Sequence, residues 1–299
     1  MNFSEKLKSK RKEFGMSQEQ LAEKLNVSRQ AITKWETDGG LPDIENILSI
    51  ASLFNITVDD LLSSEKQMKS RSDFFYNSTI EYDVDSKKHL DINIGGAYEI
   101  TVIGNDSEKL RVQLASNTIE SIEQLLKVKL DDGKNNIDVD IHRDDKLSEA
   151  QLKESLYVVI SVPLKYIVGI EVSGHAHSLL INNITTESIS FDGRVNYVQT
   201  RDVLGLVELD CSTDMTVVCS NLSGGVAFNQ ISATSILHLP KGTEYQVKIK
   251  GPTNRVSYSL DGIETNAPSY PDAANIIKVS GLNMELVVNE LTDIFSVMR

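Results

Sequence analysis

The side chains with the clearest capacity for molecular recognition lie on one predicted helix, within the segment from residue 17 to residue 37. Four hydrogen-bonding residues recur there at the spacing of a single exposed helix face: Arg29, Gln30, Thr33 and Lys34. Guanidinium and amide groups pair with base edges in the DNA major groove, where arginine favours guanine and glutamine favours adenine. The pattern therefore predicts a surface for sequence-specific contact with DNA.

Two short helices and a sharp turn are predicted to hold these side chains in place. Ser17 and Ser28 are suited to cap the two helix N-termini, and Asn26 tolerates the left-handed backbone of a tight turn. The apolar residues of both helices recur at helical spacing and would pack the helices together: Leu21, Ala22, Leu25, Ala31, Ile32 and Trp35. A helix-turn-helix of this kind presents the N-terminal end of its second helix, here predicted at residues 28–37, to the major groove.

Residues 3 to about 62 resemble the Cro/C1-type helix-turn-helix family of phage repressors, which is also called the XRE family. Three segments carry the resemblance, in this order along the chain: Gly15–Ala22, Val27–Glu36 and Leu41–Leu62. The resemblance implies a small all-α head of five helices that binds double-stranded DNA. Lys10 departs from the family pattern, in which an apolar residue is usual at that position.

The resemblance also implies roles for individual residues of the head. Gln18 and Ser28 would contact phosphate or the adjacent base edge, while the four-residue face described above would lie in the groove. Arg11 and Glu36 would form a structural ion pair, and a phosphate contact by Arg11 is the alternative.

Beyond the predicted head at residues 1–63, the chain changes from helical to alternating periodicity. Residues 64–73 are polar and lack an apolar period, which is typical of a linker. Residues 74–299 alternate apolar and polar side chains in short segments, which predicts an all-β domain. The molecule is therefore expected to be multidomain, with a helical DNA-binding head followed by a mainly-β domain that has a candidate sub-boundary near residues 145–156.

Turn residues divide the β domain into regular short strands. A hairpin is predicted around the turn at residues 131–136, and a helix only at residues 148–154. From residue 167 to residue 249, strands are expected to begin 8 to 11 residues apart, which is typical of a β-sandwich or a β-solenoid. These segments resemble the adhesin-like β-repeat domains that follow such heads in some bacterial regulators. The apolar tail at residues 291–298 is expected either to cap the β core or to meet a second subunit.

Charge is distributed unevenly between the two predicted domains. The chain has 30 basic and 43 acidic residues, but residues 1–71 hold 11 of each, so all 13 net negative charges lie after residue 71. DNA binding must therefore depend on a local cationic face of the head, for which Lys24, Arg29 and Lys34 are the candidates. The acidic β domain would be repelled by DNA.

The composition, with 40% apolar and 24% charged residues, is that of a soluble globular protein, and no apolar run reaches membrane length. Five basic residues lie between Lys6 and Lys12 without an apolar segment, so we expect no secretion signal and a cytoplasmic protein. Cys211 and Cys219 are expected to be small buried apolar side chains in a reducing compartment.

Motifs for enzymatic or metal chemistry are incomplete. The chain has no Ala-Gly or Cys-Gly bond of the kind that self-cleaving repressors cut, and no His-Glu-x-x-His zinc motif. Gly169, His175 and His177 match the opening of a cupin motif, but the remaining metal ligands of that motif are missing. We therefore predict no enzyme activity, no cofactor and no metal site.

These observations predict a sequence-specific DNA-binding transcriptional regulator that acts as a homodimer. A single small head contacts only a few base pairs, so specificity requires two heads on half-sites roughly 34 Å apart. The β domain would serve oligomerisation or sensing, with an effector that the sequence does not identify. The alternative is a non-enzymatic interaction or scaffold protein whose head docks on protein, a function that a neutral head and an acidic body favour.

Overall fold

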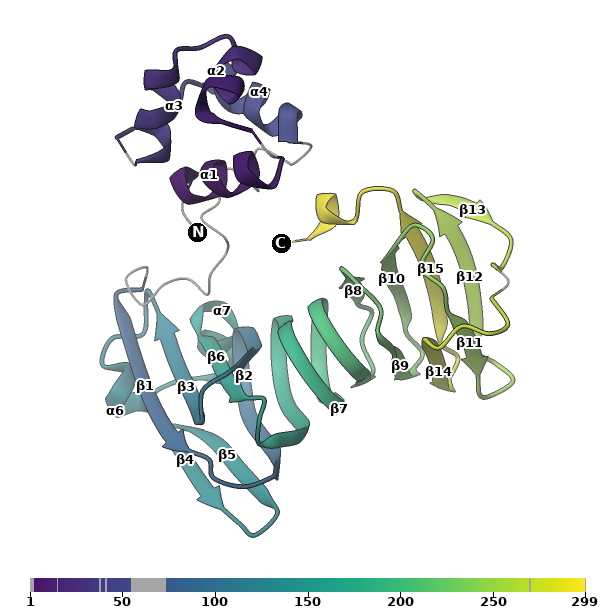
Figure 1. Cartoon of the computed structure of the whole chain (residues 1–299). Coiled ribbons are helices and arrows are strands. Elements are labelled where there is room, and N and C mark those ends of the chain that lie inside the picture. Colours follow the sequence, from purple (N-terminus) through teal and green to yellow (C-terminus); the bar gives the residue numbers. More distant parts are fainter. Residues whose placement is uncertain are drawn as a thin grey trace. The chain divides into compact units, whose positions relative to one another are not determined.

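The chain divides into two units, residues 1–70 and 71–299 (Figure 1). The computed structural model describes residues 3–14, 16–37, 39–40, 42–54, 74–268 and 270–298. The predicted fifth helix at residues 57–62 and the predicted linker at residues 64–73 lie outside these ranges. No helix within the described ranges is long and apolar enough to cross a membrane.

Four helices form the described part of the first unit: α1 (Phe3–Glu13), α2 (Gln18–Leu25), α3 (Arg29–Glu36) and α4 (Ile44–Phe54). Helix α2 begins with a capping box. The Ser17 hydroxyl accepts a hydrogen bond from the Gln20 backbone N–H (3.2 Å), and the Gln20 side-chain oxygen accepts one from the Ser17 N–H (2.8 Å). Asn26 follows α2 in the left-handed conformation, with φ of 54°, which turns the chain toward α3.

The helices of the first unit share one apolar core. Each helix contributes one side chain with no exposed surface: Leu7, Leu21, Ile32 and Ile50. Trp35 is buried in the same cluster. It is therefore a packing residue of α3.

The second unit contains fifteen strands and three short helical segments among its described residues. The strands are β1 (Tyr76–Asp83), β2 (Lys88–Asn105), β3 (Lys109–Ser116), β4 (Leu126–Asp132), β5 (Asn136–Arg143), β6 (Tyr157–Pro163), β7 (Ile167–Cys211), β8 (Thr216–Cys219), β9 (Gly224–Ile231), β10 (Thr234–Pro240), β11 (Gln246–Ile249), β12 (Arg255–Leu260), β13 (Ile263–Thr265), β14 (Ile276–Leu282) and β15 (Glu285–Leu291). The helical segments are α6 (Ile122–Leu125), α7 (Glu149–Ser155) and the 3₁₀ turn η2 (Ile294–Val297).

These strands pair into one large mixed β-sheet. Parallel pairing joins β2 to β7, and it joins β7 to both β8 and β9. Among the described strands, antiparallel pairing is confined to β1 with β3, β3 with β6, β4 with β5 and β12 with β13. Parallel pairing of this extent is not that of an antiparallel sandwich, which was one of the two architectures expected from the sequence.

Two strands, β2 and β7, are long enough to take part in two series of paired strands. One series runs β6, β2, β7, β8, β10, β15 and β12, and the other runs β5, β2, β7, β9, β14 and β11. The first half of β2 pairs with β5, at Leu90 and Ile137, while its second half pairs with β6, at Ile100 and Val158. Figure 1 shows β7 winding through successive turns between these neighbours.

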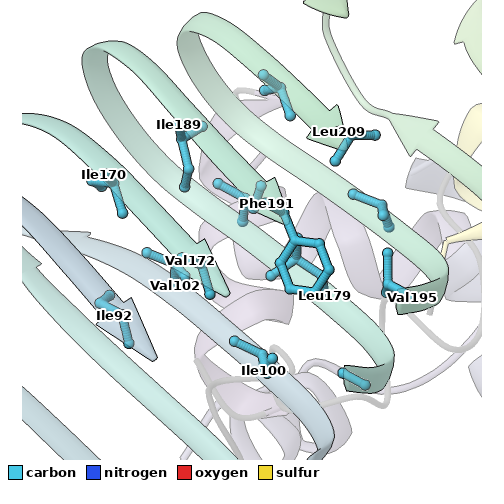
Figure 2. Close-up of a cluster of buried hydrophobic side chains, with 14 of the residues drawn as sticks. Ile92, Ile100, Val102, Ile170, Val172, Leu179, Ile189, Phe191, Val195 and Leu209 are labelled. Carbon is cyan, nitrogen blue, oxygen red and sulfur yellow. The ribbon is translucent and has the colours of Figure 1, made fainter. Parts of the chain in front are cut away.

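Apolar side chains form the core of the second unit. They lie on successive passes of the chain, by which we mean the consecutive turns of β2, β7 and the strands that pair with them in parallel. Ile170 and Val172 are buried whereas Glu171 between them is exposed, as expected for alternation along a strand. The next pass repeats this pattern with Ile189 and Phe191, and Figure 2 shows these labelled side chains gathered between the ribbons. The core is therefore a continuous column of apolar residues.

The hairpin predicted around residues 131–136 is present, because β4 and β5 pair in antiparallel fashion from Leu126 and Arg143 to Asp132 and Ile137. Helix α7 lies where a helix was expected. The prediction that no other helical segment occurs in the β domain is wrong, since α6 and η2 are also present; with four residues each they are too short to show a helical period. The sheet continues across residues 145–156, because β2 pairs with both β6 and β7 beyond them.

The C-terminal tail packs on the β domain. Ile294 in η2 is buried in a small cluster with Tyr197 and Val218. The Tyr197 hydroxyl donates a hydrogen bond to the Val297 carbonyl oxygen (3.1 Å). Of the two roles considered for this tail, the structure therefore supports the capping of the β core.

Both cysteines are buried thiols without a disulfide bond. Burial raises the pKa of Cys211 to about 12 and that of Cys219 to about 11. Thiols with such pKa values are protonated at neutral pH, which fits the expected role of small apolar side chains.

Candidate nucleic-acid interface

The N-terminal end of α3 presents the side chains that the sequence singled out. The Ser28 hydroxyl accepts a hydrogen bond from the Ala31 backbone N–H (3.1 Å), so Ser28 caps the helix and α3 begins at Arg29. Five residues at this end and along one side of α3 are exposed: Ser28, Arg29, Gln30, Thr33 and Lys34. Ile32 and Trp35 face the core instead. The helix thus separates a packing side from a polar side that is open to solvent.

A buried ion pair fixes α3 against α1. Arg11 donates from Nε to Glu36 Oε1 (2.6 Å) and from Nη2 to Glu36 Oε2 (2.9 Å), and its Nη1 donates to the Met16 carbonyl oxygen (2.8 Å). Two parallel hydrogen bonds to one carboxylate restrict both side chains to a single geometry. Arg11 therefore links the end of α1, the segment before α2 and the end of α3.

The charges of this pair stabilise each other. Burial raises the pKa of Glu36, but the hydrogen bonds from Arg11 and Gln18 lower this pKa by more than burial raises it. The pKa of Glu36 therefore lies below its ordinary value. The hydrogen bond with Glu36 raises the pKa of Arg11. Both groups are consequently charged at neutral pH.

Gln18 connects the two helices of the motif. Its side-chain nitrogen donates to Glu36 Oε2 (2.9 Å), and its side-chain oxygen lies 3.3 Å from the Thr33 hydroxyl, which can donate to it. These bonds orient the Gln18 amide at the N-terminus of α2, beside the exposed side of α3. No local sequence pattern predicts this network, because the residues that it joins are 15 and 18 positions apart.

Arg29 forms an ion pair with Glu19 at the surface. Arg29 Nε lies 3.8 Å from a carboxylate oxygen of Glu19, and both side chains are mostly exposed. An exposed pair of this kind contributes little to stability and exchanges easily for another anion. Glu19 is thus an acidic neighbour of the candidate interface that the sequence analysis did not include.

The loop after α3 approaches Lys34 closely. The Gly39 N–H donates to the Lys34 carbonyl oxygen (2.9 Å), and a Cβ atom at Gly39 would lie 2.9 Å from Lys34 Cγ. A side chain at Gly39 would therefore require the exposed Lys34 side chain to shift.

The histidines that matched part of a cupin motif have other neighbours. His175 Nδ1 lies 2.8 Å from Glu149 Oε1, and the His177 ring stacks on Tyr98 with ring centres 5.3 Å apart. Within the described part of the chain, no group of three or more His, Cys, Asp or Glu side chains is arranged to hold a metal ion.

Comparison with known proteins places the head in a family. Residues 7–61 match the family HTH_3, helix-turn-helix. The chain is 30% identical over 91 residues to the HTH-type transcriptional regulator ImmR of Bacillus subtilis, an alignment that covers 30% of this chain and 72% of ImmR. The chain belongs to the XRE family of helix-turn-helix transcriptional regulators. These regulators are a non-enzymatic class of DNA-binding proteins.

Two further proteins are similar to parts of this XRE-family regulator. The HTH-type transcriptional activator BcrR of Enterococcus faecalis is 48% identical over 66 residues, which are 22% of this chain and 32% of BcrR. The chain thus spans about a third of the length of that relative. A crystal structure of a candidate cell adhesion protein from Clostridium sporogenes aligns with 72% of this chain and all of that chain, with a TM-score of 0.37 and 12% identity.

Proposed function

We propose that this XRE-family chain is a sequence-specific transcriptional regulator whose helix α3 enters the DNA major groove. The observation that carries the proposal is the exposed polar side of α3, held by the buried Arg11–Glu36 pair on a helix-turn-helix. Phosphate contacts set the register of a DNA-binding protein on the duplex, and the recognition helix then contacts the bases in that register. The helix must therefore hold its base-contacting side chains in a fixed position.

The proposed contacts follow from the chemistry of each side chain. Arg29 pairs best with guanine and Gln30 with adenine, since each can form two hydrogen bonds to the respective base edge. Thr33 and Lys34 lie on the same exposed side of α3 and would contact bases or the backbone farther along the groove. Gln18 and Ser28 would contact phosphate or the adjacent base edge, and the hydrogen bonds that link Gln18 with Thr33 and Glu36 would hold its amide in position for this.

We further propose that the regulator binds its operator as a homodimer. One helix covers too few base pairs for useful specificity, so two heads on neighbouring half-sites are needed. The β domain, which we interpret as a β-solenoid from its parallel series of strands, would hold the two chains together or sense a signal. A regulator of this kind acts on the chromosome, so we place it in the cytoplasm.

The second candidate function is that of an interaction or scaffold protein. The neutral head and the surplus of acidic residues after residue 71 favour this alternative. The two functions differ in their response to salt. DNA affinity that falls steeply as salt rises supports the regulator, because phosphate neutralisation releases counterions, whereas absence of DNA binding supports the scaffold.

The assignment of α3 can be tested by selection of genomic DNA fragments with the purified full-length protein, followed by measurement of affinity for the selected site. The double variant Arg29→Ala/Gln30→Ala should lose preference for that site over random DNA by about tenfold or more, since each base contact contributes about 1–3 kcal/mol of discrimination.

A matched control changes two exposed residues on other helices of the head, Lys12 in α1 and Leu48 in α4, to alanine. The control should retain the preference. Unchanged specificity in the Arg29/Gln30 variant, with the fold intact by circular dichroism, would reject the assignment of α3 as the recognition helix.

A further inference from the structure

The outer surface of the β domain has a groove of about 640 Å³ where strands β7, β9, β14 and β11 lie side by side. This volume is within the size range of small-molecule sites, roughly 300–1,000 Å³. One wall of the groove carries Lys248, Lys250 and Lys278. The opposite wall carries Glu208 and Asp210.

Strand register brings the three lysines together. Lys248 in β11 and Lys278 in β14 are direct partners in a parallel pair, and Lys250 follows Lys248 by two positions, on the same face of the sheet. Neighbouring strands are about 4.8 Å apart, so the ammonium groups of Lys248 and Lys278 share one small region of surface. Like charges at directly paired positions are destabilising unless an anion neutralises them.

No described acidic residue forms an ion pair with these lysines. Within the described residues, none of the three lysines forms an ion pair, and all three side chains are exposed. These three cations therefore form a local positive surface in a protein with a net charge of −13. The free ammonium groups are therefore available to a ligand.

The acidic wall and the lysines stand on strands that are not direct neighbours. Glu208 in β7 pairs with Ala227 in β9, which pairs with Lys278 in β14, so the backbones of Glu208 and Lys278 lie two strand spacings apart. That separation is about 9–10 Å between backbones. The methyl group of Ala227 leaves the floor of the groove open between the two walls.

Hydrogen-bonding side chains lie on the floor beside the lysines. Asn229 in β9 and Ser280 in β14 are register partners. The Ser280 hydroxyl lies 3.1 Å from the Phe228 carbonyl oxygen, and Asn229 donates from its side-chain nitrogen to Asp210. These polar groups make the floor suitable for a hydrated or polar ligand rather than an apolar one.

We propose that this groove binds a small molecule with two neighbouring anionic groups, phosphate or carboxylate, on Lys248, Lys250 and Lys278. Two adjacent anionic groups match the two paired ammonium groups, with the third lysine beside them. The acidic wall limits the ligand to a small one, because a long polyanion such as DNA would extend over Glu208 and Asp210 and be repelled. The proposal does not depend on DNA binding by the head.

Isothermal titration calorimetry of the full-length protein, without DNA, tests the proposal with inorganic pyrophosphate in one arm and citrate in the other. The wild-type protein should bind at least one of the two, more weakly as salt rises. The triple variant Lys248→Gln/Lys250→Gln/Lys278→Gln should lose affinity by at least about tenfold. The arm that binds more tightly identifies phosphate or carboxylate as the preferred group.

The matched control removes three exposed lysines from another part of the same domain, Lys87→Gln/Lys129→Gln/Lys134→Gln. This control should bind within about twofold of the wild type, although it has the same net charge as the test variant. Equal loss in both triple variants would indicate a general charge effect and overturn the site. Absence of binding by the wild type to both anions would also overturn it.

Thermal unfolding of the β domain, followed by circular dichroism, checks that both triple variants remain folded.

The genomic selection experiment on the head is a separate measurement, so loss of operator binding and loss of anion binding can be distinguished. A groove that binds anions in a protein without operator preference would refute the proposed regulator and leave the anion site standing.

Discussion

At the scale of single residues, Glu36 connects the helices of the head more directly than the other charged side chains described there. It accepts hydrogen bonds from Arg11 in α1 and from Gln18 in α2, while it belongs to the end of α3. Its side chain is 1% exposed, so loss of Arg11 leaves a buried charge without its cationic partner. The position of the proposed recognition surface therefore depends on Arg11 and Glu36, which are not among the proposed DNA contacts.

Replacement of Arg11 by methionine should destabilise the head by about 3 kcal/mol, because it leaves Glu36 buried without its cationic partner. Urea unfolding followed by the fluorescence of Trp35 measures this change, since Trp35 is the only tryptophan of the chain and lies in the core of the head. The control Arg29→Met removes a cation from the exposed pair with Glu19 and should cost less than about 1 kcal/mol. Equal effects of the two substitutions would contradict this interpretation.

The same pair predicts how the stability of the head depends on pH. The folded-state pKa of Glu36 lies below its ordinary value of 4.5, so the stabilisation is complete above that pH and is lost as pH falls through the folded-state value. The unfolding free energy of the wild-type head should therefore decrease below pH 4.5. In Arg11→Met this part of the acid dependence should weaken or reverse, because burial then raises the pKa of Glu36.

At the scale of elements, the β domain requires close approach of successive passes of the chain at certain glycines. Gly193 has a φ of 138°, and a Cβ atom there would overlap the carbonyl oxygen of Gly174 on the neighbouring pass. Gly224 has the same relation to Gly205. At both places the separation along the chain is 19 residues, so these glycines mark equivalent positions of successive passes.

The substitution Gly193→Ala should destabilise the β domain by about 3 kcal/mol or more, because backbone atoms rather than a flexible side chain would have to move. The control Gly262→Ala has φ of 81° but no atom within 4 Å of the added methyl group. It should cost only about 1 kcal/mol, from backbone conformation alone. Denaturant unfolding followed by far-ultraviolet circular dichroism separates the two cases, and similar costs would show that the contact with Gly174 is unimportant.

At the scale of the whole molecule, the described residues form separate apolar cores in the two units. The core of the head and the main core of the β domain have no residue in common. A unit with a single apolar core commonly unfolds in one cooperative transition. Two units with separate cores are therefore expected to unfold in two steps. This expectation also fits a regulator in which a signal in one unit must be passed to another through the connecting chain or through assembly.

Differential scanning calorimetry should therefore show two transitions, and core substitutions should move them independently. Leu21→Ala should lower the midpoint of the head by roughly 10 °C or more, and Phe191→Ala should lower only that of the β domain, since large-to-small changes in a core cost about 3–5 kcal/mol. Each substitution serves as the control for the other. A single transition that shifts with both substitutions would mean that the two units unfold together.

The sequence was most informative where structure depends on neighbours along the chain. Ser17, Asn26 and Ser28 mark the ends of helices through bonds to residues three or four positions away, so α2 and α3 could be placed within one or two residues. Alternation of apolar side chains likewise located the strands of the β domain and the β4–β5 hairpin. The repeat of 19 residues between Gly174 and Gly193, and between Gly205 and Gly224, was a signal of parallel passes that the sequence analysis did not use.

The sequence by itself determined the helix-turn-helix, the family and the change from helical to β structure near residue 74, because caps and periodicity are local properties. Only the tertiary structure decided which strands pair, since an alternating strand has the same pattern in a parallel and in an antiparallel sheet. It also brought Gln18 to Glu36 and Thr33, and Lys248 to Lys278, across 15 to 30 residues of chain. Contacts at such separations depend on packing and strand register, which no local pattern specifies.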